Sequence, residues 1–97
     1  MEDYKKQGVL NKQYRGQIMR IVARFYPTSI SGKQVKIGLE AFGVDYKADV
    51  DKHLYYLENK GYIKINKGTK AKEEMIIITA LGIDLIEDTV QDEGVLI

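Results

Sequence analysis

The sequence has no cysteine and no tryptophan, and only one proline among its 97 residues. Without cysteine, a disulfide framework, a thiolate metal site and thiol catalysis are all excluded. The longest apolar run, Met75 to Ile78, is far too short to cross a bilayer. The first eight residues, MEDYKKQG, lack the apolar core of a signal peptide. We therefore expect a cytoplasmic protein that does not associate with a membrane.

The chain does contain enough apolar material for one folded domain. Hydrophobic residues make up 44% of the sequence, and the length lies near the lower end of what supports an independent core. The net charge of +1 hides a strong segregation, because residues 1–74 sum to +6 and residues 75–97 to −5. Such segregation decides which surface of the protein meets a polyanion.

The first part of the chain predicts a lead-in followed by a helix. We expect residues 1–10 to be a flexible lead-in, residues 11–90 a single domain and residues 91–97 a C-terminal tail. Asn11 is the proposed N-cap of the first helix, and Pro27 ends it because the residue before a proline is pushed out of the α region. The apolar face of this helix consists of Tyr14, Ile18, Ile21, Val22 and Phe25.

Two further helices follow after short connections. Ser31 is the expected N-cap of a helix from Gly32 to Phe42, which Gly43 ends in a conformation with φ > 0. A third helix, residues 46–60, is expected to begin after Asp45 as its N-cap and to stop at Gly61. Its apolar residues fall at helical spacing and define a buried face, and they are Val50, Leu54 and Leu57.

The last third of the chain predicts a hairpin and a final helix. Tyr62 to Asn66 and Glu73 to Thr79 form β-type runs around the polar turn Lys67 to Lys72. Thr79 is the expected N-cap of the last helix, whose inner face consists of Leu81, Leu85 and Ile86. The predicted fold class is therefore α+β, in the order α-α-α-β-β-α.

Two stretches carry a resemblance to known DNA-binding families. The run Val50 to Ile63, VDKHLYYLENKGYI, resembles the end of the recognition helix in MarR-, ArsR- and PadR-type regulators. These regulators have a valine, two leucines three residues apart, and an acidic-polar-basic-glycine exit into the first wing strand. Ile78 to Ile86 looks like their second wing strand and final helix. The chain is also similar to small winged-helix proteins carried by phages and prophages, and the resemblance covers about Asn11 to Asp88.

The resemblance implies a winged helix-turn-helix fold with a two-stranded wing, and a transcriptional regulator that binds double-stranded DNA as a homodimer. By position, the recognition helix would contact DNA through Tyr46, Lys47, Ala48, Asp49, Asp51, Lys52, Tyr55 and Tyr56. The wing would contact the backbone or the minor groove through Lys64, Lys67, Thr69, Lys70 and Lys72.

Several alternatives stay open at this level. Asp49 and Asp51 stand where Ser, Thr, Asn or Arg would be more usual, and the 46–60 helix is neutral overall. These features favour a second hypothesis, a protein-interaction module with the same fold that does not bind DNA. Tyr55 and Tyr56 point about 100° apart, so one of them is expected to pack beneath the wing and the other to face a phosphate or a partner. The end of the chain forms either a dimer seam or a frayed tail, and its apolar residues are Val90, Val95, Leu96 and Ile97.

No combination of residues indicates catalysis or cofactor binding. His53 is the only histidine, and no carboxylates or other ligands lie at metal-binding spacing around it. The chain has neither a nucleophile-elbow motif nor a phosphate-cradling glycine loop. We therefore expect no enzymatic activity, no metal and no small-molecule cofactor, and a structural or solvent-exposed role for His53.

Overall fold

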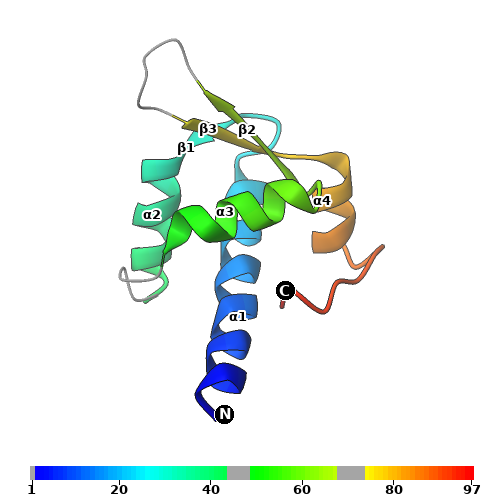
Figure 1. The fold of residues 1–97 in the computed structure, drawn as a ribbon. Coiled ribbons are helices and arrows are strands. Elements are labelled where there is room, and N and C mark those ends of the chain that lie inside the picture. Colours follow the sequence, from blue (N-terminus) through cyan, green and yellow to red (C-terminus); the bar gives the residue numbers. More distant parts are fainter. Residues whose placement is uncertain (1, 44–48, 68–73) are drawn as a thin grey trace.

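The computed structural model describes residues 2–43, 49–67 and 74–97, with side chains from Lys6 onward. These residues form a small α+β domain of four helices and a three-stranded antiparallel sheet, an arrangement compatible with a winged helix (Figure 1). In chain order the elements are α1 (Glu2–Arg24), β1 (Ile30–Ser31), α2 (Gly32–Ala41), α3 (Val50–Asn59), β2 (Ile63–Lys67), β3 (Glu74–Ile78) and α4 (Ala80–Ile86). Within the described ranges, no helix is long and apolar enough to cross a membrane.

The predicted hairpin is present, and it is joined by a strand that the sequence did not predict. The strand order is β1-β3-β2, with Ile63 opposite Ile78 and Lys67 opposite Glu74. On the other side of β3, Ile30 of β1 lies opposite Ile76. A strand of two residues is too short to show alternation in a sequence, so only the pairing with β3 reveals it.

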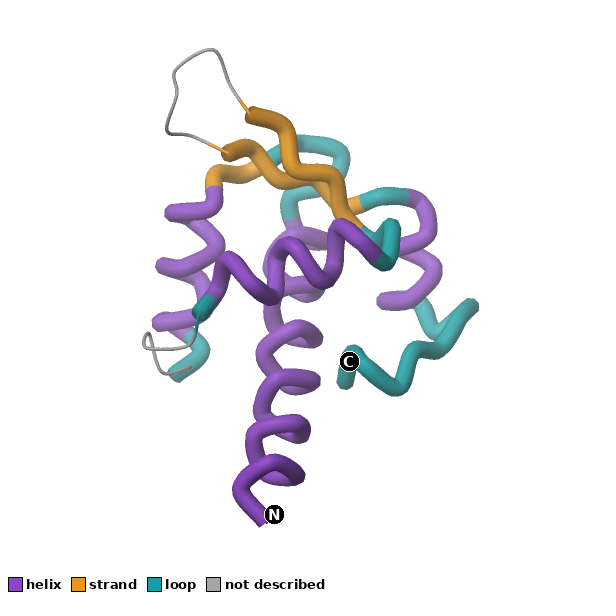
Figure 2. Tube along the Cα trace, viewed as in Figure 1, coloured by secondary structure: helices purple, strands orange, loops and turns teal. Residues whose placement is uncertain are grey.

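Helix α1 is longer than predicted. It begins at Glu2, so Asn11 lies inside the helix and is not its N-cap. Gly8 does not interrupt the helix, since one glycine in a helix interior costs only about 1 kcal/mol relative to alanine. The first half of α1 extends away from the rest of the domain (Figure 2). Helix α1 therefore runs without a break through the position where the lead-in was expected to end.

Most of the predicted helix ends are confirmed. The Ser31 hydroxyl accepts a hydrogen bond from the backbone N–H of Gln34, whose side chain in turn accepts one from the Ser31 N–H. This reciprocal pair is a capping box. Gly43 and Gly61 have φ values of +76° and +84°, the left-handed conformation that favours glycine after a helix. Thr79 caps α4 by accepting a hydrogen bond from the Gly82 N–H.

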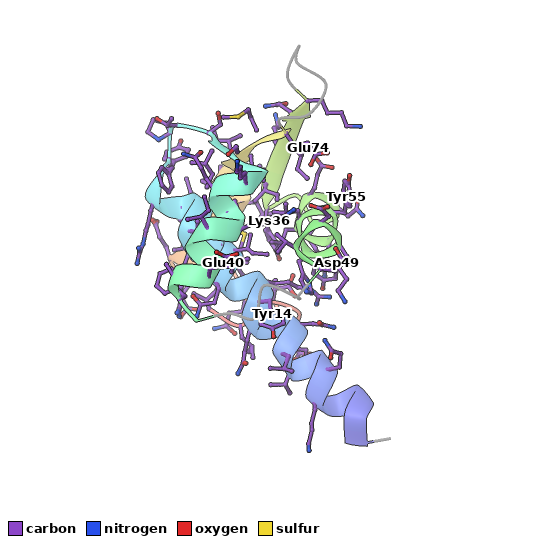
Figure 3. All side chains as sticks on the ribbon, turned by 90° about the vertical axis from the view of Figure 1, so that its left-hand side faces the viewer. Tyr14, Lys36, Glu40, Asp49, Tyr55 and Glu74 are labelled. Atoms are coloured by element: carbon purple, nitrogen blue, oxygen red, sulfur yellow. The ribbon has the colours of Figure 1, made fainter. Side chains whose placement is uncertain are left out.

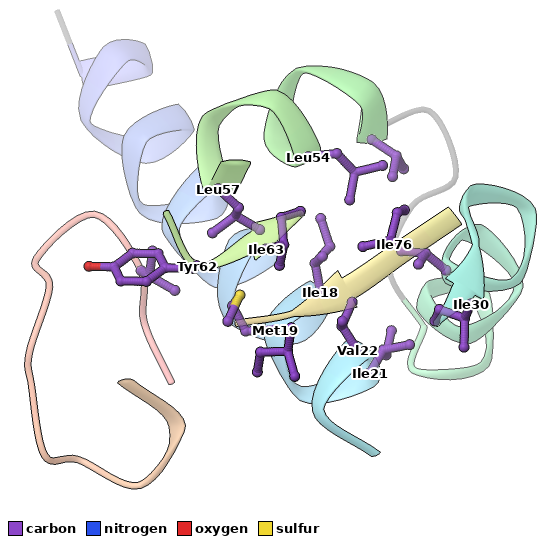
Figure 4. Packing of buried hydrophobic residues seen from close by; sticks show 14 of the residues in the cluster. Ile18, Met19, Ile21, Val22, Ile30, Leu54, Leu57, Tyr62, Ile63 and Ile76 are labelled. Atoms are coloured by element: carbon purple, nitrogen blue, oxygen red, sulfur yellow. The ribbon is translucent and has the colours of Figure 1, made fainter. Parts of the chain in front are cut away.

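The core lies where α1 and α3 meet the sheet (Figure 4). The three apolar residues predicted for the inner face of α3 are all buried, and they are Val50, Leu54 and Leu57. Other residues that were predicted to face the core are exposed. Ile37, 57% exposed, lies on the opposite side of α2 from Val35 and Leu39. Phe25, Phe42 and Leu81 are between 42% and 45% exposed because they sit at the ends of their helices, past the core.

The end of the chain is not a frayed tail. We call residues Asp92–Ile97 the C-terminal strap, because this segment crosses α1 and is bonded to it. The Leu96 N–H donates to the Lys12 carbonyl over 3.1 Å, and the Val95 side chain is only 3% exposed. At Gly16 the approach is so close that an added Cβ would lie 1.6 Å from the Leu96 carbonyl oxygen.

Candidate nucleic-acid interface

The exposed face of α3 is narrow and mostly polar. Lys52, Tyr55 and Asn59 are exposed and follow each other at i, i+3 and i+7, so they form one stripe along the helix. Tyr55 is 49% exposed. An ammonium group, a phenol and a carboxamide can all hydrogen-bond to base edges or phosphates in a DNA groove. This stripe is the part of α3 that is able to contact a nucleic acid.

The start of α3 differs from the prediction. The helix begins at Val50 with Asp49 as its N-cap, so the predicted start at Tyr46 was wrong. Asp49 accepts a hydrogen bond from the Lys52 N–H over 3.3 Å, so its carboxylate caps its own helix. The other predicted residues in this part, Tyr46, Lys47 and Ala48, and the predicted cap Asp45 lie outside the described residues.

Asp51 also has a local explanation. It is exposed and lies in the first turn of α3, where a carboxylate interacts favourably with the positive end of the helix dipole. An acidic residue at this place stabilises the helix by a few tenths to about 1 kcal/mol. The two aspartates that are unusual for a DNA-reading helix are thus accounted for by the way the helix begins.

Tyr55 and Tyr56 do face different surroundings, but Tyr56 is not beneath the hairpin. It is partly buried against α1, with the Arg15 guanidinium carbon 3.6 Å from its ring centroid and the Lys60 ammonium 5.6 Å away. Arg15 also donates a hydrogen bond to the Gly94 carbonyl in the strap. Tyr56 therefore joins three elements of the domain, and of the two tyrosines only Tyr55 is available to a ligand.

The hairpin stands beside α3 and is bonded to it. The Glu58 carboxylate accepts a hydrogen bond from the Ile65 N–H over 2.9 Å, which ties the last turn of α3 to strand β2. Two of the predicted wing residues, Lys64 and Lys67, are exposed on that strand. The other three, Thr69, Lys70 and Lys72, lie outside the described residues. The bond through Glu58 fixes the position of the two described lysines relative to the α3 stripe.

Helix α2 adds positive charge that the sequence analysis did not assign to the site. Lys33 and Lys36 are exposed and three residues apart, so they lie on one face of α2. In Figure 3, α2 and α3 lie side by side, with Lys36 and Glu40 on α2, Tyr55 on α3 and Asp49 just before it. The spacing of the two lysines was visible in the sequence and could have indicated an exposed basic face.

Behind α3 a hydrogen-bonded cluster holds the strap in place. The buried Tyr62 hydroxyl donates to the Asp92 carboxylate over 2.5 Å, and the Lys60 ammonium lies 3.4 Å from the same oxygen. Burial and the Asp92 hydrogen bond raise the pKa of Tyr62 to about 12. That hydrogen bond in turn holds the pKa of the Asp92 carboxyl below its usual value. The cluster connects the turn between α3 and β2 to the strap, and its role is structural.

His53 lies beneath the exposed stripe, within the core. Its side chain is 1% exposed, its ring centroid is 5.9 Å from that of Tyr14, and neither ring nitrogen has a hydrogen-bond partner among the described residues. Burial, followed by the nearby charges of Arg15 and Lys52, lowers the pKa of His53 to about 4. The imidazole is therefore neutral at pH 7. In the described part of the chain, no group of three or more His, Asp or Glu side chains could hold a metal ion.

No protein-family model matches the sequence, and none of the curated proteins matches it either.

Proposed function

We propose that this chain is a winged-helix protein that binds duplex DNA, with α3 in the major groove and the β2–β3 hairpin against the sugar-phosphate backbone. One observation carries the proposal. The exposed stripe of α3, which ends in Asn59, stands next to a strand with the exposed lysines Lys64 and Lys67, and the Glu58–Ile65 hydrogen bond fixes the two elements relative to each other. A reading helix beside a basic hairpin matches the way such folds divide base contacts from phosphate contacts.

Each exposed residue then has a role set by its chemistry. Lys52 donates to the acceptors of guanine in the major groove, and Tyr55 donates its hydroxyl to a phosphate. Lys64 and Lys67 neutralise phosphates without regard to sequence. Lys36 is exposed on α2, the helix that lies beside α3 in Figure 3, and would add a further phosphate contact. The protein would act in the cytoplasm, as a transcriptional regulator.

The proposed regulator is a homodimer, which would allow two copies of α3 to read paired half-sites. The surface that supports this part of the proposal consists of apolar side chains left exposed at the protruding half of α1 and on the strap. Their exposed fractions lie between 40% and 48%, and they are Val9, Leu10, Leu96 and Ile97. Exposed apolar side chains that gather in one region often mark a protein interface.

Fluorescence anisotropy with a mixed-sequence duplex tests the proposal. We expect binding that weakens steeply between 50 and 200 mM salt. Lys64→Glu together with Lys67→Glu should weaken binding to all sequences alike and lower the slope of log K against log salt by about 1.8, since each phosphate contact contributes about 0.9. Lys52→Ala should instead change the preference among sequences.

The matched control is the double variant Lys64→Arg and Lys67→Arg, which keeps both charges and should keep the wild-type salt slope. A flat titration of the wild-type protein at low salt would overturn the proposal. Equal losses in the Glu and Arg double variants would show that the two positions act through folding and not through charge.

A protein-interaction module is the second candidate, and one observation favours it. Tyr55 is half exposed beside the carboxylate of Asp51, and Ile37 is 57% exposed on the neighbouring helix. Aromatic residues are enriched at protein interfaces, and an acid beside them repels a polyanion. If neither the wild-type protein nor the Tyr55→Ala variant binds DNA in the titration, the protein-interaction module is the better explanation.

A further inference from the structure

The strongest positive charge in the chain does not lie on α3 or the hairpin. From Tyr4 to Leu39 the sequence contains eight lysines and arginines and no aspartate or glutamate. This acid-free segment includes most of α1, all of β1 and most of α2. The remainder of the chain contains every acidic residue. The positively charged side chains of this segment have to lie on the surface of the protein.

The second half of α1 is covered by the rest of the domain around most of its circumference. Tyr14 lies against His53, and a Cβ added at Gly38 would come within 3.1 Å of Ile21; Tyr14 and Ile21 are seven residues apart and share one face of the helix. The strap covers α1 at Gly16, about 160° around the helix from Tyr14. The residues between these two faces are buried, and they are Ile18, Met19 and Val22, so one sector of this half of α1 remains open.

The open sector carries a polar and basic stripe. Gln13, Arg20 and Arg24 follow each other at spacings of seven and four residues, which places them on one face, and all three are exposed. With a rise of 1.5 Å per residue, the stripe is about 17 Å long. It therefore reaches along about five base pairs of a duplex, at 3.4 Å per step of one strand.

The two arginines of this α1 stripe are available to an anion. The described part of the chain has one ion pair, between Lys60 and Asp92, so neither Arg20 nor Arg24 has a carboxylate partner among the described residues. Arg24 instead lies 5.2 Å from the centroid of the Phe42 ring, a cation–π contact, and its N–H groups donate no hydrogen bond among the described residues. Arginine presents several N–H donors in a geometry that suits phosphate oxygens.

We propose that the α1 stripe is a second DNA-binding surface, which holds the phosphate backbone of a second duplex segment while α3 contacts the first. In Figure 3, α3 lies at one side of the domain and the second half of α1 at the other, an arrangement that suits two separate stretches of duplex. The α1 stripe carries positive charge and no acid, so it attracts the phosphates of a polyanion and does not distinguish between bases. The protein therefore bridges two stretches of DNA. The bridging rests on the proposed function of α3, whereas the α1 contact does not.

A bead assay tests this proposal. One duplex is fixed to beads, the protein is added, and the retention of a second, fluorescent duplex of the same sequence is measured. The wild-type protein should retain the second duplex. Arg20→Glu with Arg24→Glu should lower the retention at least tenfold, while anisotropy with a single dilute duplex changes by less than about threefold. Thermal unfolding of each variant, followed by circular dichroism, checks that it is folded.

The control is Arg20→Lys with Arg24→Lys, which keeps the charge and should keep the retention. Unchanged retention in the double Glu variant overturns the proposal, and this is the result expected if a homodimer bridges the duplexes through two copies of α3. Unchanged DNA retention combined with loss of binding to phosphatidylserine vesicles also overturns it, in favour of a lipid surface.

The two proposals fail in different ways. If α3 does not bind DNA, Lys52→Glu with Lys64→Glu leaves anisotropy of a single duplex unchanged, whereas the double Glu variant of the α1 stripe abolishes it. The function proposed for α3 is then wrong and the α1 surface stands. If the α1 stripe does not bind, its double Glu variant alters neither measurement.

Discussion

Helices α1 and α3 pack against each other through Tyr14 and His53, but their outer faces differ in charge: one carries both signs and the other only positive charge. The described exposed face of α3 mixes Lys52 with Asp51, whereas the exposed stripe of α1 is basic or neutral along its whole length. A surface that carries both signs of charge has little net attraction to a polyanion, so its binding depends on the particular groups it meets and can be selective. A surface that carries only positive charge is attracted to any phosphate. The two helices are thus suited to different parts of one task.

The largest effect is expected from breaking the contact that closes one side of α1. Gly16→Ala places a Cβ 1.6 Å from the Leu96 carbonyl oxygen, so the strap has to move and Val95 loses its buried position. We expect the free energy of unfolding to fall by about 2 kcal/mol, which is the value of burying a valine side chain together with a hydrogen bond, less the gain in helix propensity.

The matched control lies in the same helix. At Gly8 an added Cβ meets nothing within 4 Å, so Gly8→Ala should raise the free energy of unfolding by up to about 1 kcal/mol. Urea unfolding of both variants measures the difference. Changes of the same sign in the two variants would show that the strap does not depend on the close approach at Gly16.

The second effect concerns the contact between the two helices. The pKa of His53 is about 4 in the folded protein, below the usual 6.5, so the unfolded chain takes up a proton first as the pH falls. The free energy of unfolding therefore decreases between about pH 6.5 and pH 4. His53→Leu should remove this component and raise stability at pH 7 by about 1 kcal/mol, because two unpaired nitrogens leave the core.

Urea unfolding of the wild-type protein and the His53→Leu variant at pH 7 and pH 4.5 isolates the histidine, because the carboxylates that titrate in this range are common to both. If the two proteins lose stability equally on acidification, the imidazole is not buried as the structure describes.

The smallest effect tests whether the charge balance of α3 matters. Asp51→Asn should increase the affinity for duplex DNA about twofold to fivefold, because one negative charge leaves the proposed groove face. The same change should reduce stability by about 0.5 kcal/mol through the lost interaction with the helix dipole. Anisotropy and urea unfolding measure the two effects.

Glu93→Gln is the control for Asp51→Asn, since it makes the same change in net charge on the exposed surface of the strap. It should leave the affinity close to that of the wild-type protein. An equal gain in both variants would mean that net charge alone sets the affinity and that Asp51 does not face DNA.

The parts of the fold that depend on neighbouring residues could be predicted from the sequence. Ser31 and Thr79 cap the helices that follow them, and Gly61 ends α3 with positive φ, because caps and turns are determined within a few residues. The beginning of α3 was misjudged because Asp45 and Asp49 are both competent N-caps. The sequence alone does not show which of them is used.

The parts that depend on distant residues could not be predicted. The two residues of β1 become a strand only through their pairing with β3, and the strap is held by Arg15 and Tyr62, which lie far away in sequence. The same holds for the candidate site. That Tyr56, and not Tyr55, packs against α1 follows from the position of Arg15. The α1 stripe was visible in part, since the sequence places Arg20 and Arg24 off the apolar face of the first helix; that Arg15 does not belong to the stripe follows from its contact with Tyr56.

The hydrogen bond from Ile65 to Glu58 has a consequence for self-association. Strand β2 is at the edge of the sheet, where unpaired backbone N–H groups invite another chain to add a strand. The Glu58 carboxylate occupies one of these groups in the middle of the strand. A strand from another chain could pair here only by displacing the Glu58 carboxylate, which would then lie next to the carbonyl groups of that strand. The residue that positions the hairpin thus also protects the sheet against aggregation.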